Sequence, residues 1–159
     1  MTRYLTILLT LLAAQTASAQ HLPDNPVARA IVGAYADACA TETGSPDMTF
    51  EPGAFVPVDL DEDPATEDMV VDMRFATCDR LPALFSGSGG SPIHLIVGED
   101  TAEFFGGHWQ IVDFGDDGFR SRIFLLGVHG LYCDGYGSQL CVRAIGYADG
   151  VFSTQPVLE

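Results

Sequence analysis

Four cysteines constrain the fold of this 159-residue chain more than any other feature: Cys39, Cys78, Cys133 and Cys141. Four cysteines can form two disulfides in three ways. The turn-rich segment between Cys133 and Cys141 favours a disulfide across a hairpin, which would leave Cys39 and Cys78 to pair with each other. A zinc site is the competing use, but the chain has no Cys-x-x-Cys and its His residues are scattered. We expect two disulfides.

Residues 1–19 have the pattern of an export signal. Arg3 supplies a positive start, residues 5–14 are apolar, and Ala17-Ser18-Ala19 is a small-residue cleavage site. The mature chain would be residues 20–159, a single domain, with no later segment that suits a membrane helix. Disulfides form in oxidising compartments, so we expect a periplasmic or secreted protein without stable membrane insertion.

The net charge of the chain limits the classes of molecule that it can bind. The chain has 22 Asp and Glu and 7 Arg but no Lys, and loss of Arg3 with the signal would take its net charge from −15 to −16. Such a surface repels nucleic acid and anionic membranes and attracts cations and basic proteins. The plainer interpretation is that the acidity only keeps an exported protein in solution.

The apolar pattern predicts one helix followed by strands. Asn25 and Pro26 suit the start of a helix at about 26–40, with an apolar face made by Val27, Ala30, Ile31, Ala34, Tyr35 and Ala38. Strands are expected at 48–51, 54–58, 69–75, 93–97, 103–106, 109–114, 120–129, 140–147 and 151–153. Short loops between the strands predict an α+β domain, in which the amphipathic N-terminal helix packs on a mostly antiparallel, disulfide-stapled β-meander.

Residues 55–73 are the most acidic part of the chain. Seven of the 22 acids lie there between two apolar runs, and Ca²⁺ takes six to eight oxygen ligands from flexible loops. The sequence therefore predicts a hairpin loop that binds Ca²⁺ or is simply solvated. Without a metal, repulsion among these carboxylates should raise their pKa values, so the protein would gain stability at mildly acidic pH.

The string Asp59-Leu60-Asp61-Glu62-Asp63, with Asp68 and an aliphatic run after it, resembles the calcium loop of integrin-type FG-GAP repeats. Those loops read Asp-Leu-Asn/Asp-Gly-Asp-Gly-x-x-Asp. The resemblance implies that Asp59, Asp61 and Asp63 are ligands and that Asp68 or Glu67 completes the shell. The chain departs from the FG-GAP motif at two points. Pro64 stands where the family has the Gly that makes the bend, and one extra residue precedes the last Asp.

A wider resemblance covers more of the chain. The helix with Cys39, the acidic loop, Cys78, Gly87-Ser88-Gly89-Gly90 and His129-Gly130-x-x-Cys133 with Cys141 resemble small exported alphaproteobacterial proteins of no assigned activity. In those relatives a cysteine pair brackets the Gly-rich segment, where this chain has Ser86 and Ser91. The resemblance implies the pairs Cys39–Cys78 and Cys133–Cys141.

Three functions are compatible with these features. The first is a non-enzymatic exported domain, with Ca²⁺ bound at residues 59–68. The second is a binding or inhibitory protein for a basic partner, such as a cationic wall-degrading enzyme. The third is a small hydrolase that uses His129 or His108 with an acid. The chain has no nucleophile elbow, metalloprotease motif or phosphate-binding loop, so the enzyme is the least favoured hypothesis.

Overall fold

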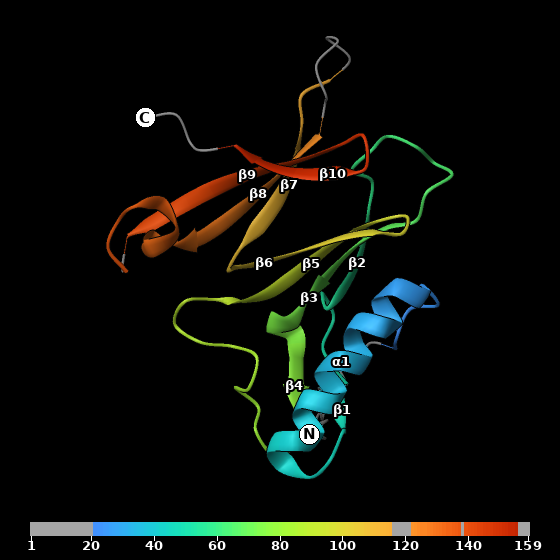
Figure 1. Cartoon of the computed structure of the whole chain (residues 1–159), viewed down its shortest axis with the longest axis vertical. Helices are drawn as coiled ribbons and strands as arrows, with labels where there is room; N and C mark the ends of the chain where they lie inside the picture. Colours follow the sequence, from blue (N-terminus) through green and yellow to red (C-terminus); the bar gives the residue numbers. More distant parts are fainter. Residues whose placement is uncertain (1–20, 116–121, 138, 156–159) are drawn as a thin grey trace, which may run out of the picture.

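The described residues form one α-helix and three antiparallel sheets (Figure 1). The computed structural model describes residues 21–115, 122–137 and 139–155. The expected export signal at 1–19 lies outside these ranges, as do residues 120 and 121 of one expected strand. The mixed fold class expected from the sequence is confirmed.

Two four-stranded sheets stack on each other. The first has the order β2 (Phe55–Val58), β3 (Asp68–Asp72), β5 (Ser91–Val97), β6 (Asp100–Gly106). The second has the order β10 (Val151–Gln155), β9 (Leu140–Ala148), β8 (Arg122–His129), β7 (Trp109–Asp113). A two-stranded sheet joins β1 (Met48–Phe50) to β4 (Ala76–Cys78), and short 3₁₀ helices η1 (Met73–Phe75) and η2 (Gly130–Cys133) follow β3 and β8.

The β2-β3-β5-β6 sheet is the middle layer of the molecule, because it is covered on both faces. On one face Met69, Val71 and Ile96 pack with α1 (Pro26–Thr43). On the other face Val70 and Leu95 pack with the β7–β10 sheet. Side chains alternate between the faces of a strand, so a strand buried on both sides must be apolar almost throughout. This explains the continuous run Met69-Val70-Val71 within β3, all five residues of which are buried.

The helix begins where the sequence predicts it. The Asn25 side chain accepts hydrogen bonds from the backbone N–H groups of Val27 and Ala28 at 3.0 and 2.9 Å, and Pro26 occupies the first turn. The helix then runs to Thr43, past the expected end at 40, and Gly44 ends it with a φ of 77°.

The buried face of α1 differs from the expected one. The fully buried helix residues are Ala28, Val32 and Cys39, with Val27, Ile31 and Tyr35 packed partly against the core. The expected face residues Ala30, Ala34 and Ala38 are exposed. Small alanines fit either face of a helix, and the larger Val32 and the disulfide at Cys39 determine the orientation.

Both disulfides pair as expected. Cys39 at the end of α1 is bonded to Cys78 of β4, with Cα atoms 5.8 Å apart, and Cys133 is bonded to Cys141 with Cα atoms 6.5 Å apart. The first disulfide attaches the helix to the small sheet, and the second closes the segment between β8 and β9. None of the helices in the described ranges combines the length and apolar character needed to span a bilayer.

Most expected strands are present with ends shifted by a few residues. The expected strand at 69–75 is the main exception: it ends at Asp72, where the carboxylate accepts a hydrogen bond from the Arg74 N–H at 3.0 Å and turns the chain into η1. The sequence did not predict β4, which follows η1 and pairs with β1.

Candidate metal centre

The acidic loop joins β2 to β3, and the pairing of these strands fixes its base. Val58 is the register partner of Asp68, so Asp59, the residue after Val58, lies close to Asp68. The eight residues between Asp59 and Asp68 must therefore close on themselves above the end of the sheet.

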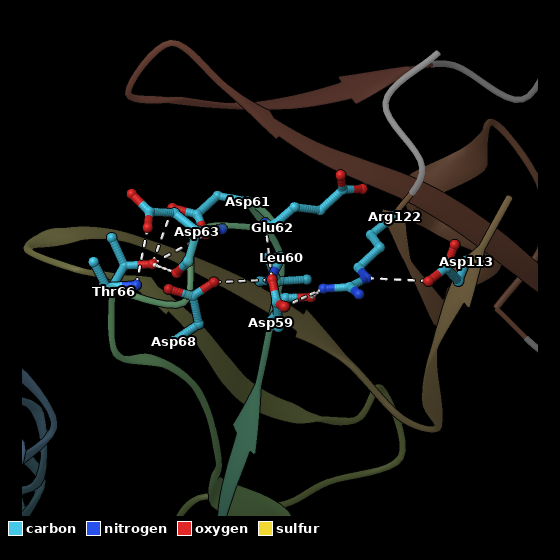
Figure 2. A network of polar contacts seen from close by, with 10 residues as sticks. Asp59, Leu60, Asp61, Glu62, Asp63, Thr66, Asp68, Asp113 and Arg122 are labelled. Atoms are coloured by element: carbon cyan, nitrogen blue, oxygen red, sulfur yellow. Dashed lines mark hydrogen bonds and ion pairs between the residues drawn. The ribbon is translucent and has the colours of Figure 1, made fainter. Parts of the chain in front are cut away.

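Carboxylates order the loop by accepting its backbone N–H groups (Figure 2). Asp59 accepts from the Glu62 N–H at 2.8 Å, Asp61 from the Asp63 N–H at 2.9 Å, and Asp63 from the Ala65 N–H at 2.9 Å. The Thr66 hydroxyl contacts both carboxylate oxygens of Asp61 at 3.0 and 3.1 Å. Asp side chains favour such turns because they reach backbone donors two or three residues ahead.

Three of the five expected ligands come together. Asp59, Asp61 and Asp68 each place one carboxylate oxygen so that the three oxygens lie within 4.8 Å of one another. Asp63 and Glu67 are not in this group. Glu67 instead accepts a hydrogen bond at 3.3 Å from Asn25, the residue that caps α1, and so connects the loop to the helix.

Asp68 is the unusual member of the group, because it is an almost fully buried acid with an exposed fraction of 5 %. Its Oδ2 accepts the Leu60 N–H at 2.8 Å. Its Oδ1 is buried and has no hydrogen-bond partner among the described residues. A buried carboxylate oxygen without a partner lowers the stability of the fold by about 1–3 kcal/mol or more, because it loses its hydrogen bonds to water and forms none in the protein.

Burial is the main cause of a raised pKa at Asp68, and the charge of Asp61 adds to it. The Leu60 N–H acts in the opposite direction, with smaller lowering contributions from the Thr66 hydroxyl and the Asp61 N–H, neither of which reaches hydrogen-bond geometry at Oδ1. The expected rise in pKa is therefore found at Asp68, but burial contributes more to it than repulsion does.

Asp59 differs from that expectation, because its pKa is lowered by a hydrogen bond from Arg122. Arg122 lies at the start of β8 and forms an ion pair with Asp59 across the two sheets. It also donates to Asp113 at 3.2 Å and to the Asp59 carbonyl at 3.3 Å. Figure 2 places Arg122 on one side of Asp59, and Asp61, Thr66 and Asp68 on the other. No local sequence pattern indicates this contact, because it joins residues 63 positions apart.

The three carboxylates have the chemistry and spacing of a site for a hard divalent cation. Calcium–oxygen distances are about 2.3–2.6 Å, so two oxygens on opposite sides of one ion lie about 4.6–5.2 Å apart. The carboxylate oxygens, at up to 4.8 Å, are close enough for one ion to contact all three. Three carboxylates do not fill a shell of six to eight oxygens, and water or nearby loop oxygens would supply the rest.

Three histidines lie at two places in the structure: His94 in one, and the hydrolase candidates His108 and His129 in the other. His94 is buried beneath α1, with Nε2 2.9 Å from the Tyr35 hydroxyl. His108 and His129 line one cavity, remote from the acidic loop in sequence. The lining of that cavity, in the part of the chain that the structure describes, contains no carboxylate that could assist a catalytic histidine.

In comparisons with known proteins, no family model, curated sequence or solved structure matches this chain. Its function must therefore be inferred from its own residues.

Proposed function

We propose that this chain is an exported, non-enzymatic domain that binds one calcium ion between β2 and β3, with Asp59, Asp61 and Asp68 as its carboxylate ligands. Two disulfides are consistent with folding in an oxidising compartment. The observation that carries the proposal is the unpartnered, buried Oδ1 of Asp68. A cation bonded to that oxygen would recover the free energy that burial of the carboxylate costs.

The loop conformation also supports this proposal. Glu62 has a φ of 64°, in the left-handed region that glycine adopts most readily. In the resemblance to FG-GAP loops, Glu62 corresponds to the first glycine of the motif, so the chain bends there despite lacking the glycine.

Calcium is favoured over magnesium by the irregular set of donors. Magnesium requires a near-ideal octahedron at about 2.0–2.1 Å and keeps much of its water, whereas calcium accepts variable geometry and more ligands. Here the three carboxylates come from a loop and a strand end, and Asp59 is shared with Arg122. Such a site suits the larger, more adaptable ion.

Two measurements on the oxidised chain test the proposal. The first is a calorimetric titration with Ca²⁺, and the second is chemical unfolding in the presence of chelator, Ca²⁺ or Mg²⁺. At a free Ca²⁺ concentration 100 times the dissociation constant, binding should add about 2.7 kcal/mol to the free energy of unfolding. Asp61→Asn should remove most of this gain. Asp63→Asn is the matched control, because it makes the same charge change in the same loop outside the carboxylate group.

Equal gains in both variants would contradict the proposed ligands, and no Ca²⁺ effect on the unmodified chain would contradict the site. In that case the loop would be a solvated acidic surface, and the basic protein partner inferred from the charge of the chain would become the leading hypothesis.

A further inference from the structure

A row of residues crosses the middle sheet at the end that carries the acidic loop. Val97 of β5 pairs with Asp100 of β6. Met69 pairs with Ile96, so Asp68 and Val97, the next residue on each strand, lie opposite each other. The row therefore runs from Asp68 to Asp100 across β3, β5 and β6. Neighbouring strands lie about 4.7–4.9 Å apart, so the Cα atoms of these two acids are roughly 10 Å apart.

The side chains of Asp68 and Asp100 lie on the face of the middle sheet that the β7–β10 sheet covers. Asp68 is two residues before Val70, and Asp100 is four residues before Phe104. Val70 belongs to the apolar core between the two sheets, and Phe104 packs against that core. Residues two or four positions apart on a strand share a face. Both acids therefore project towards the β7–β10 sheet.

Tyr147 of β9 meets this row from the other sheet. It lies on the same face of β9 as the buried Ile145 and packs on Phe152, with ring centroids 4.8 Å apart. Its hydroxyl donates a hydrogen bond to Oδ2 of Asp100 at 2.6 Å. This hydrogen bond connects the β7–β10 sheet to the Asp100 end of the row.

The carboxylates of the proposed calcium site act on the same hydroxyl. The hydrogen bond to Asp100 is the main cause of a pKa raised to about 12 at Tyr147, and partial burial is the next. The negative charges of Asp61 and Asp68 raise this pKa further. Because the interaction between charges weakens with distance, these two proposed ligands must lie near the Tyr147 hydroxyl.

The β5–β6 turn that precedes Asp100 also contacts the acidic loop. A Cβ at Gly98 would lie 3.8 Å from Cγ2 of Thr66, whose hydroxyl contacts the Asp61 carboxylate. In Figure 1 the acidic loop, the β5–β6 turn and the β9–β10 turn lie at the same end of the two four-stranded sheets. The proposed calcium site is therefore bordered by residues of both sheets.

We propose that Asp100 is an outer carboxylate of the calcium site, accepting a hydrogen bond from a calcium-bound water, and that Tyr147 is the residue that positions it. This inference rests on the proposed calcium function. Tyr147 occupies Oδ2 of Asp100, and Oδ1 is the oxygen that accepts from the water. Two calcium–oxygen bonds and one hydrogen bond measure about 7–8 Å end to end. With the two side chains, that length covers the roughly 10 Å between the Cα atoms of Asp68 and Asp100.

The buried Oδ1 of Asp68, which has no hydrogen-bond partner among the described residues, faces the same side of the sheet and would bind the ion directly. The three proposed carboxylate ligands leave room for water in a shell of six to eight oxygens. A carboxylate that holds one of these waters stabilises the bound ion without touching it. Because Tyr147 belongs to β9, calcium binding would also strengthen the contact between the two sheets.

The experiment is a calorimetric Ca²⁺ titration of the oxidised chain and its variants. Asp100→Asn should weaken calcium binding about tenfold, as is typical when a residue behind the metal ligands is changed. Glu99→Gln is the matched control, because it makes the same charge change one residue away in the same exposed turn. It should weaken binding at most about twofold, since the charge of an exposed side chain is screened by salt.

Tyr147→Phe keeps the aromatic ring and removes the hydroxyl, and should weaken calcium binding about three- to tenfold. Tyr35→Phe is its control. The Tyr35 hydroxyl also has a pKa raised to about 12, but it lies beneath α1 on the other face of the middle sheet. Tyr35→Phe should bind calcium as the parent does.

A double-mutant cycle tests the positioning role. In an Asp100→Asn background, Tyr147→Phe should cause little further loss of calcium affinity, because a positioning residue acts only through the group that it holds. Calcium should also change the near-ultraviolet absorbance of tyrosine, and this change should be absent from Tyr147→Phe and retained in Tyr35→Phe. A full loss in both backgrounds would mean that Tyr147 acts by packing on Phe152, which would overturn its positioning role.

The outcomes separate this inference from the proposed function. Calcium binding that Asp61→Asn abolishes, but that Asp100→Asn and Tyr147→Phe leave unchanged, would overturn the inference and leave the calcium site intact. Equal losses in Asp100→Asn and Glu99→Gln would assign the effect to net charge and would also overturn it. No calcium binding by the unmodified chain would overturn both.

Discussion

The Tyr35 hydroxyl lies 2.9 Å from Nε2 of His94 and joins the middle of α1 to β5 of the middle sheet. The two rings also meet edge to face, with centroids 5.5 Å apart, and Phe85 packs on the other side of Tyr35 at 4.9 Å. His94 is 7 % exposed, and the Glu103 carboxylate lies 3.9 Å from its Nε2.

His94 should make the protein less stable in mild acid. Burial lowers the pKa of His94 below its ordinary 6.5, and the Glu103 charge offsets this only in part. As the pH falls below 6.5, His94 of the unfolded chain binds a proton while His94 of the folded chain stays neutral. The free energy of unfolding therefore decreases as the pH falls below 6.5. Each unit of pKa difference is worth about 1.4 kcal/mol. Chemical unfolding in chelator from neutral pH to about pH 5 would measure the loss.

His94→Gln should flatten this part of the pH profile, whereas Tyr35→Phe, which keeps the imidazole buried, should retain it. An unchanged slope in His94→Gln would contradict the assignment to this residue. Asp68 acts in the opposite direction at lower pH, because its raised pKa lets the folded protein take up a proton first and so gain stability. The gain in mild acid predicted from the sequence is therefore opposed by the buried His94.

Asp68→Asn should stabilise the metal-free protein at neutral pH by about 1 kcal/mol, since it removes the charge whose burial raises the Asp68 pKa. The amide oxygen can keep the bond from the Leu60 N–H. The same variant should abolish the stabilisation by Ca²⁺. Unfolding curves with chelator and with Ca²⁺ test both effects, and a loss of stability in chelator would show that the charged form is required for folding.

Arg122→Gln should tighten calcium binding about three- to fivefold, because it removes a positive charge bonded to one ligand, Asp59. Arg80→Gln makes the same charge change at an exposed position whose guanidinium bonds to the Thr43 carbonyl, and should have no such effect. Calorimetric titration measures the difference. Weaker binding in Arg122→Gln would show that the arginine holds Asp59 in its ligating position rather than competing for it.

Local sequence signals predicted the features that depend on near neighbours. Asn25-Pro26 marked the helix start, and the acids after Val58 indicated a hairpin loop. The short spacing of Cys133 and Cys141 favoured their pairing. In each case the physical cause lies within about ten residues of the chain, so the pattern is visible in the sequence.

Features made by distant residues could not be predicted in this way. The helix orientation depends on what Val32 and Tyr35 meet in the folded core, and the state of Asp59 depends on Arg122 from another sheet. The cavity lined by His108 and His129 is assembled from segments far apart in the sequence, among them the loop before β5 and the end of β8. Asp72 is another example: it belongs to the acidic stretch, yet its side chain is fully buried away from the calcium ligands.

The buried Asp72 provides the last prediction. Arg74 Nε contacts both of its carboxylate oxygens at 3.0 Å, and the Trp109 N–H donates to Oδ2 at 2.8 Å. Arg74→Met should lower the free energy of unfolding by about 3–5 kcal/mol, because it leaves a buried carboxylate without its counter-charge. Arg80→Met, at an exposed arginine, should stay within about 0.5 kcal/mol of the parent.

A double-mutant cycle separates this charge effect from lost packing. In an Asp72→Asn background there is no buried charge to neutralise, so Arg74→Met should cost markedly less than in the parent. Chemical unfolding of the four proteins gives the coupling free energy, expected at about 1–3 kcal/mol. A coupling near zero would mean that the Arg74 side chain acts by covering Phe75, over which its guanidinium lies at 5.4 Å from the ring centroid.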